Sequence, residues 1–415
     1  MAEYSRSNLD SNFGENSAGD CILFSTADWD APCWTNKQHT AQLLAKQGWR
    51  VLYVESPGLR APSVSSGRDW SRLIRRFKRG LRSLLLGPVK VEKKIHVLSP
   101  LMIPIGHASP FIKLINQGLL RYSLKRFMRR YKFSPPLVWA YHPYILESIK
   151  GIPLKSLIYH CVDDLSAVPG IDAKAFLAEE IRFLNRCDAV FTTAPALQEK
   201  CLQHNPRSYY YSNVVDFDHF SSALEPGKIP ADLDEIPQPR LLYHGVLSDF
   251  KVNFSLLLNV SMLHPEWQFV LIGDEREGQS CERVKALKAR PNVHFLGHRS
   301  YHSLPDYLRG MDVGLLPTLL NEYTRSMFPM KFYEYLAAGL PVVSTPLDFT
   351  TQPHSHLMLG ENAETFAAAI QAQLLNKKLS KEEARLAVGE NTWENRMHKM
   401  MALAMAQSKV KGDKI

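Results

Sequence analysis

The residues best suited to chemistry by type and spacing lie in segment 328–344, FPMKFYEYLAAGLPVVS. Lys331 and Glu334 are three positions apart, so a helix would present both side chains on one face. Pro329 favours the first turn of such a helix, and Gly339 favours its end. A glutamate accepts hydrogen bonds from ribose hydroxyls, and a lysine or a helix N-terminus binds phosphate. A solvated salt bridge on the helix surface is the alternative interpretation.

Two stretches of alternating strand and helix patterns surround this segment, and such alternation is typical of parallel sheets. The fold class is therefore expected to be α/β, with two doubly wound, Rossmann-like domains. Residues 19–220 form the predicted N-terminal domain, and residues 239–388 form the C-terminal one. Between them, residues 221–238 are rich in proline and acidic residues and are predicted to be a linker. Residues 1–18 are predicted to be disordered, and residues 389–415 to form a helix that returns toward the first domain.

Composition restricts the class of function. With 415 residues, 45% hydrophobic and 22% charged, the chain can bury two cores. A net charge of +9 favours an anionic partner, although surplus Lys and Arg also serve solubility. The six cysteines contain no CxxC pair, which favours reduced thiols in a cytoplasmic setting. The polar N-terminus lacks the apolar run of a signal peptide, and no run is long enough to span a membrane.

In open parallel sheets, ligands bind beyond the carboxyl ends of the strands. No GxGxxG follows the first predicted strand, and no GxxxxGK[ST] is present, so neither a dinucleotide fold nor a P-loop is supported. In the C-terminal half this rule selects the loops that follow the predicted strands.

Segment 328–344 resembles the nucleotide-sugar site of GT-B glycosyltransferases of family 4, especially the branch similar to teichuronic-acid biosynthesis glycosyltransferases. The resemblance covers nearly the whole chain after residue 18. It implies two domains facing each other across a cleft, with the donor nucleotide in the C-terminal one. Glu334 matches the second glutamate of the family motif, which binds the donor ribose. Ser326 stands where the family has the first glutamate, eight positions earlier.

The same resemblance implies further donor contacts. Gly245 and Lys251 match a glycine and a basic residue that the family places on the donor diphosphate. Gly273 ends a strand that lines the nucleotide pocket. The loop expected to pack on the base contributes His298, Tyr301 and Leu304, although an isolated tyrosine or leucine is more often part of a core.

In the N-terminal half, His160 corresponds to a histidine that related proteins place beside the transferred sugar. With Asp163 and Asp164 on the same loop, it forms the predicted catalytic group; a purely structural histidine is the alternative. An acceptor or phosphate loop is predicted from Asn36, Lys37 and His142, with an ordinary helix cap as the alternative for the first two.

The resemblance implies that a sugar moves from a nucleotide sugar to a glycan or lipid-linked acceptor, in cell-surface polysaccharide or glycolipid synthesis. The family is generally retaining and metal-independent, so no metal and no cofactor beyond the co-substrate are expected. Asp28 and Asp30 spell a DxD, but without a third ligand this is a weak cation signal. A sugar-nucleotide epimerase of the same fold, or a noncatalytic sugar-nucleotide-binding paralogue that has lost the glutamate at Ser326, are the alternatives.

Two basic stretches, 70–85 and 111–133, carry apolar residues at helical spacing with arginines and lysines between them. Basic amphipathic helices of this kind bind membrane surfaces, which predicts peripheral attachment to an anionic cytoplasmic leaflet. The alternative is a pair of ordinary domain helices, each burying one face in its own core. No nucleic-acid-binding motif accompanies the charge, so no nucleic acid is expected as a partner.

Overall fold

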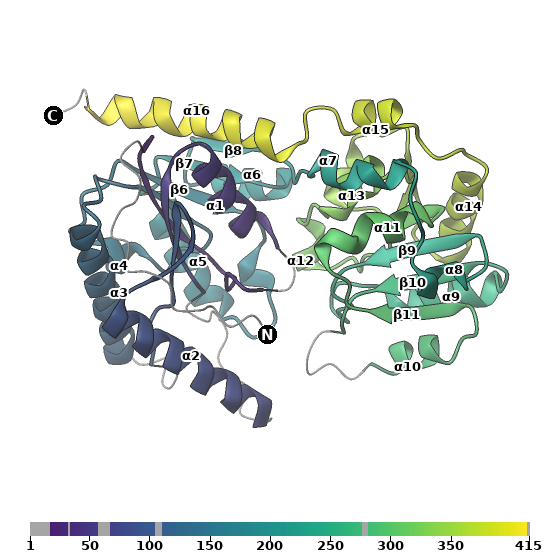
Figure 1. Ribbon diagram of the computed structural model, residues 1–415, viewed down its shortest axis with the longest axis horizontal. Coiled ribbons are helices and arrows are strands. Elements are labelled where there is room, and N and C mark those ends of the chain that lie inside the picture. The colour runs from purple at the N-terminus through teal and green to yellow at the C-terminus, as the bar shows by residue number, and fades with distance from the viewer. Residues whose placement is uncertain (1–16, 32–33, 57–66, 104–109, 276–280, 413–415) are drawn as a thin grey trace. The chain divides into compact units, whose positions relative to one another are not determined.

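The computed structural model describes residues 17–31, 34–56, 67–103, 110–275 and 281–412 (Figure 1). Two compact units divide the chain: unit 1 contains residues 1–191, 201–209 and 400–415, and unit 2 contains residues 192–200 and 210–399. The segment 1–18, predicted to be disordered, lies outside the described residues except for Ser17 and Ala18. The later part of the last helix, α16 (Trp393–Gly412), is grouped with unit 1.

Unit 1 is built on an eight-stranded sheet in the order β3-β4-β2-β1-β5-β6-β7-β8. Its strands are β1 (Asp20–Phe24), β2 (Arg50–Val54), β3 (Val89–Glu92), β4 (Ile95–Leu98), β5 (Leu137–Ala140), β6 (Ser156–Cys161), β7 (Ala189–Thr192) and β8 (Ser208–Tyr210). The pairs β1–β2, β2–β4, β1–β5 and β5–β6 are parallel, and β3 joins the edge antiparallel to β4. All residues of β1 are buried, as expected for a central strand covered on both faces.

The helices of unit 1 include α1 (Asn36–Lys46), α2 (Gly67–Leu86), α3 (Pro110–Arg130), α4 (Leu146–Ile149), α5 (Ala173–Leu184) and α6 (Pro195–Leu202), the last shared with unit 2. The two basic stretches form α2 and α3. In α3, Leu120, Leu124 and Phe127 are buried, so this helix is an ordinary domain helix that buries one face in the core of unit 1. In α2, Ile74, Phe77, Leu81 and Leu85 are exposed instead. Among the helices the structure describes, none is long and apolar enough to cross a membrane.

Unit 2 contains a six-stranded sheet in the order β11-β10-β9-β12-β13-β14, and every neighbouring pair is parallel. Its strands are β9 (Arg240–His244), β10 (Gln268–Ile272), β11 (Val293–Gly297), β12 (Val313–Leu316), β13 (Val342–Ser344) and β14 (Leu357–Leu359). Numbered within the sheet, this is the 3-2-1-4-5-6 order of a doubly wound Rossmann fold. The parallel sheet of unit 2 and the mostly parallel sheet of unit 1 confirm the expected α/β class.

Helices cover both faces of this sheet (Figure 1). One face packs on α7 (Phe217–Ser221), α11 (Leu304–Arg309), α13 (Lys331–Ala337) and α15 (Lys381–Val388). The other packs on α9 (Phe254–Leu263), α10 (Glu282–Lys288) and α14 (Ala363–Leu374). Alternate residues of each strand serve the two cores; in β9, for example, Leu242 belongs to the first and Leu241 and Tyr243 to the second.

Residues 221–238, predicted to be a linker without a core, are packed onto unit 2. They contain the short helix α8 (Ala231–Asp234), and Leu233 and Ile236 are buried in the core on the α13 side of the sheet. The prolines and acidic residues that suggested a linker lie around these two apolar anchors. Only isolated apolar positions are buried here, so no helical or strand period is visible in the sequence.

Leu233→Ala is expected to destabilise unit 2 by about 2–5 kcal/mol, because it leaves a cavity at a fully buried position. Urea unfolding would measure the change. Leu375→Ala, at a leucine that is 79% exposed, is the matched control and should change stability by less than about 0.5 kcal/mol. Equal effects of the two substitutions would show that this segment is not part of the core.

Candidate functional site

The candidate donor site lies in unit 2 where β9 and β12 are adjacent and the strand order reverses. At such a switch point the loops after the two strands diverge and leave room for a ligand. Three hydrogen bonds join these loops: Leu319 N donates to Lys251 O at 2.8 Å, Asn253 N donates to Pro317 O at 2.8 Å, and Asn321 Nδ2 donates to Phe250 O at 2.8 Å. The loops therefore hold each other in place at the carboxyl edge of the sheet.

Lys331 lies against the backbone of Gly245. A Cβ built on Gly245 would sit 2.5 Å from Cε and 2.8 Å from Nζ of Lys331, so a side chain there would displace the lysine. Gly273 is as constrained: its φ is +141° and its Cβ would meet Gly245 O at 2.0 Å. The structure thus brings together Gly245, Gly273 and Lys331, which lie in three separate segments of the sequence.

Glu334 is buried, with 8% of its surface exposed, next to His244 at the end of β9. Burial raises the pKa of this carboxyl to about 7, and the nearby Lys331 opposes the rise. Burial and Lys331 lower the pKa of His244 to about 3, so the ring is neutral. The atoms His244 Nε2 and Glu334 Oε2 are 3.3 Å apart, but their geometry is not that of a hydrogen bond. The burial of Glu334 rules out the solvated surface salt bridge.

Two tyrosines, Tyr335 and Tyr301, lie near Glu334 and contact neighbouring histidines. The Tyr335 hydroxyl accepts a hydrogen bond from His244 N at 3.2 Å and donates to Leu242 O at 3.3 Å. Tyr301 stacks on His219 with ring centroids 4.3 Å apart. Burial raises the pKa of Tyr301, and Glu334 and Asp216 raise it further. Tyr301 therefore lies within electrostatic range of Glu334.

Residues 213–216, which precede α7, hold the start of segment 328–344 in place. Asn213 Nδ2 donates to Phe328 O at 2.6 Å, and the Asp216 carboxylate caps α7 by accepting from His219 N at 3.1 Å. Both contacts position the backbone.

Lys251 lies between two aromatic rings. Its Nζ is 4.8 Å from the ring centroid of Tyr323 and 5.6 Å from that of Phe250. Cation–π contacts of this length restrain the ammonium group without neutralising it. Lys251 can therefore present a positioned charge at the switch point.

The remaining donor candidates are dispersed. His298 is exposed, and Leu304 packs on the unit 2 core. Ser326 is buried at the C-terminal end of α12 (Glu322–Arg325). Their roles toward a base or sugar stay predictions.

In unit 1, Tyr141 follows β5 and contacts several of the predicted site residues. Its hydroxyl lies 3.1 Å from His160 Nδ1 and 3.0 Å from the carbonyl of Asn36, in the first turn of α1. The Lys37 ammonium is 5.5 Å from the centroid of the Tyr141 ring. Asn36, Lys37 and His160 thus lie around one tyrosine side chain.

His160 is fully buried, and its tautomer follows from its neighbours. Trp139 Nε1 lies 3.3 Å from His160 Nδ1, and an indole N–H can only donate, so Nδ1 accepts and the ring proton is on Nε2. The predicted partners on the following loop differ: Asp164 accepts from Ser166 N at 3.1 Å and caps the 3₁₀ turn η1 (Leu165–Ala167), whereas Asp163 is half-buried. Their catalytic roles stay predictions.

His142, the third member of the predicted acceptor loop, is buried. Burial lowers its pKa to about 4, so its ring is neutral at physiological pH. It can offer a hydrogen bond to a ligand but no positive charge.

The DxD carboxylates bind arginines of α2. Asp28 Oδ2 is 3.1 Å from Arg76 Nη2, and Asp30 Oδ2 is 3.3 Å from Arg79 Nη2. Within the described ranges no group of three or more His, Cys, Asp or Glu side chains could hold a metal ion.

Several residues of the site were not predicted as ligand contacts. His244, Tyr323 and Tyr335 surround the donor candidates, and Tyr141 links those of unit 1. His244 could have been suspected, because it immediately precedes Gly245 at a strand end. The aromatic residues have the sequence context of core positions.

The raised pKa of Glu334 gives a testable pH dependence. The folded carboxyl holds its proton up to about pH 7, whereas the unfolded one releases it near its ordinary value of 4.5. The folded chain therefore binds more protons between these values, and stability falls as pH rises through this window. Glu334→Gln should remove up to about 3 kcal/mol of that loss, measured by urea unfolding at pH 4.5 and 7.5. Parallel pH profiles for the two proteins would mean that the carboxyl is not desolvated.

Part of the chain is similar in sequence to a known family and to a known protein. Residues 238–376 match the family model described as Glycosyl transferases group 1, which spans the strands and loops of the candidate site. TuaH of Bacillus subtilis (strain 168), assigned by name as a teichuronic acid biosynthesis glycosyltransferase, is 26% identical over 228 residues. This match covers 49% of the chain and 55% of TuaH, so it extends over about half of the relative's length.

Solved structures match over nearly the full length at low identity. Sucrose-phosphate synthase from Thermosynechococcus elongatus gives a TM-score of 0.62 at 17% identity, covering 95% of this chain and 98% of its own. HepE of Anabaena, in complex with UDP and glucose, gives 0.61 at 15% identity, covering 93% and 99%. A glycosyltransferase from Rickettsia africae gives 0.64 at 14% identity, covering 94% and 99%. The chain therefore has the GT-B fold expected from its sequence, and residues 238–376 of its unit 2 are similar to the glycosyl transferases group 1 family.

Proposed function

We propose that the chain is a glycosyltransferase that binds a nucleotide sugar in unit 2 and transfers the sugar to a glycan or lipid-linked acceptor. The buried Glu334 beside Lys331 and Gly245, at the switch point of a parallel sheet, is the observation that carries the proposal. A desolvated carboxyl with a raised pKa is typical of functional sites. The group 1 family match and the UDP complex of HepE support a nucleotide-sugar donor.

Each side chain has a role in this reaction. The Glu334 carboxylate accepts hydrogen bonds from the ribose hydroxyls. Lys251 and Lys331 stabilise the negative charge that develops on the diphosphate as the glycosidic C–O bond breaks. The acceptor hydroxyl forms the new C–O bond on the same face of the sugar, and its proton passes to the leaving phosphate. The products are the glycosylated acceptor and a nucleoside diphosphate.

We place the catalytic histidine and the acceptor loop in unit 1. His160, which the family resemblance places beside the transferred sugar, is proposed as this histidine. Asn36 and Lys37 lie at the N-terminus of α1, where backbone N–H groups and charge favour an anion. The relation to TuaH, named for teichuronic acid biosynthesis, supports an acceptor in polysaccharide synthesis. We propose from the sequence that this acceptor is a cell-surface polysaccharide or glycolipid precursor and that the enzyme acts at the cytoplasmic side.

Nucleotide sugars should raise the thermal unfolding temperature of the chain, because a ligand that binds only the native state stabilises it by mass action. A screen of UDP-, GDP-, ADP- and dTDP-sugars would identify the base. Glu334→Ala is expected to abolish the shift. Glu364→Ala, which removes an exposed carboxylate in the first turn of α14, is the matched control and should retain it. An unchanged shift in Glu334→Ala would refute the ribose assignment.

With the donor identified, product analysis tests the reaction. Transfer is expected to release a nucleoside diphosphate, to keep the anomeric configuration of the sugar by NMR, and to continue in EDTA, because Lys251 and Lys331 can serve in place of a cation and Asp28 and Asp30 engage arginines. An isomerised sugar nucleotide would instead identify an epimerase. Binding without turnover would identify a noncatalytic paralogue.

A further inference from the structure

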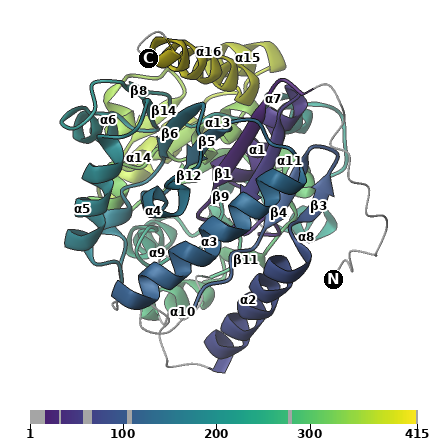
Figure 2. The same cartoon turned by 90° about the vertical axis from the view of Figure 1, so that its left-hand side faces the viewer.

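Helix α2 presents an apolar stripe to solvent. Ile74, Phe77, Leu81 and Leu85 follow at intervals of three or four residues and are 51%, 44%, 40% and 61% exposed. Such spacing places all four on one side of the helix. Figure 1 and Figure 2 both show α2 at the edge of unit 1, extending beyond the strands of its sheet. The stripe is therefore not part of the unit 1 core.

The opposite side of α2 is the side that packs on unit 1. Gly80 and Ser83 are buried, and a Cβ built on Gly80 would lie 2.7 Å from Leu101 Cα and 2.9 Å from Pro100 O. The backbone of α2 thus touches the chain just after β4, and only glycine allows this approach. The contact fixes the rotation of the helix about its axis.

Ion pairs hold the helix in this orientation. Arg76 and Arg79 reach the carboxylates of Asp28 and Asp30, and Arg79 also lies 3.2 Å from Glu55 Oε1. Because the polar side of α2 is bound to the unit, the apolar side must face outward.

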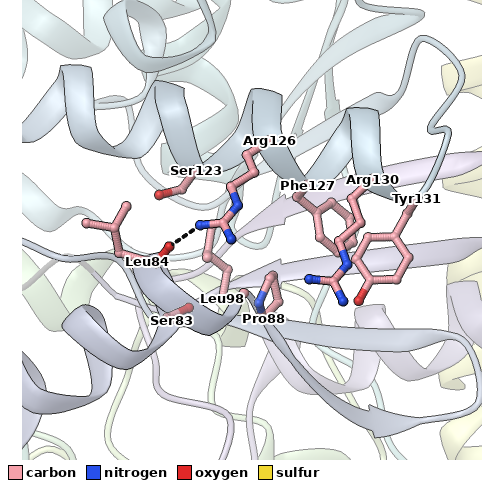
Figure 3. Close-up of a pocket in the computed structure, with 10 residues that line it drawn as sticks. Ser83, Leu84, Pro88, Leu98, Ser123, Arg126, Phe127, Arg130 and Tyr131 are labelled. Atoms are coloured by element: carbon pink, nitrogen blue, oxygen red, sulfur yellow. Dashed lines mark hydrogen bonds between the residues drawn. The ribbon is translucent and has the colours of Figure 1, made fainter. Parts of the chain in front are cut away.

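The C-terminal end of α2 is anchored separately. Arg126 of α3 donates to Leu84 O at 2.6 Å and to Leu85 O at 3.0 Å, capping carbonyls that the helix itself leaves unpaired. Figure 3 shows this guanidinium reaching the Leu84 carbonyl. With both its polar side and its end bound, α2 is a fixed platform for the stripe.

Basic side chains border the stripe. Arg75, Lys78 and Arg82 lie on one flank of the apolar stripe, at intervals of three and four residues. All three are exposed. Among the residues that the structure describes, no ion pair with an acidic group is formed by these three. An apolar stripe flanked by cations without acidic partners is complementary to an anionic lipid bilayer, in which the hydrocarbon lies below negatively charged headgroups.

We propose that α2 docks on an anionic lipid bilayer, with Ile74, Phe77, Leu81 and Leu85 in the acyl-chain boundary and the flanking cations at the phosphate level. A nucleic acid would match the charge but not the aliphatic stripe. Docking of this kind would present a membrane-embedded, lipid-linked acceptor to unit 1. This assignment of the acceptor rests on the proposed function. The docking geometry itself depends only on α2.

Co-sedimentation of the full chain with vesicles tests the docking. The chain is expected to bind vesicles of phosphatidylcholine mixed with phosphatidylglycerol, and to bind pure phosphatidylcholine more weakly. Phe77→Gln/Leu81→Gln should lower binding about tenfold, because two anchoring side chains no longer enter the bilayer. Leu375→Gln/Leu386→Gln changes two leucines of unit 2 that are 79% and 77% exposed and should bind as the unchanged chain does. Lys78→Gln/Arg82→Gln should lose the preference for anionic vesicles.

Thermal unfolding and the nucleotide-sugar shift, both measured without vesicles, should be the same in all these variants, because the changed side chains are exposed. A chain that does not bind anionic vesicles overturns the proposal, as does equal binding by Phe77→Gln/Leu81→Gln. If that pair of substitutions instead converts a dimer to a monomer in size-exclusion chromatography while vesicle binding is absent, the stripe is a protein interface. Absence of any nucleotide-sugar shift in the unchanged chain would refute the proposed function and leave the docking result standing.

Discussion

The proposed donor site of unit 2 depends on the burial of one carboxyl group, that of Glu334. A desolvated carboxyl is costly in its charged form, so at neutral pH it is stable only where a proton, a cation or a hydrogen-bond donor compensates. In the chain alone the proton and nearby Lys331 provide this compensation, and burial raises the pKa to about 7. A ribose would replace the proton with two hydroxyl donors. The same burial that destabilises the folded chain at higher pH thus prepares the group for a ligand.

Backbone constraints at the carboxyl edge of the sheet fix the residues around this carboxyl. Gly245 and Gly273 lie so close together that neither can carry a side chain without displacing Lys331 or the neighbouring strand end. The loops after β9 and β12 are joined by backbone hydrogen bonds, which also position Lys251. A rigid edge of this kind orients charges before a ligand arrives, which is what electrostatic stabilisation of a leaving diphosphate requires.

Most of the fold could be predicted because it depends on local patterns. Alternation of apolar strands with amphipathic helices marked both sheets, and Gly339 and Pro341 marked the end of α13 and the start of the next strand. Within residues 221–238, the burial of Leu233 and Ile236 could not be predicted, because the two residues are buried singly, without a period. In the candidate site, the structure brings Gly245 next to Lys331, and the donor roles of Glu334, Lys331, Gly245 and Lys251 stay predictions. The contacts of His244 with Glu334 and of Tyr141 with His160 join elements that are far apart in the sequence, and no sequence spacing encodes them.

Helix α2 shows where a periodic pattern stops being informative. Its stripe of apolar residues was equally compatible with a buried face and with an exposed one, since the hydrophobic period gives the width of a face but not its direction. Packing decides the direction. Gly80 allows the backbone to approach residues 100–101, and Arg76 and Arg79 bind Asp28, Asp30 and Glu55, so the polar side is held against unit 1. The carboxylates that could have been read as a cation site instead orient a helix, and by doing so they turn its hydrophobic side toward whatever the chain binds there.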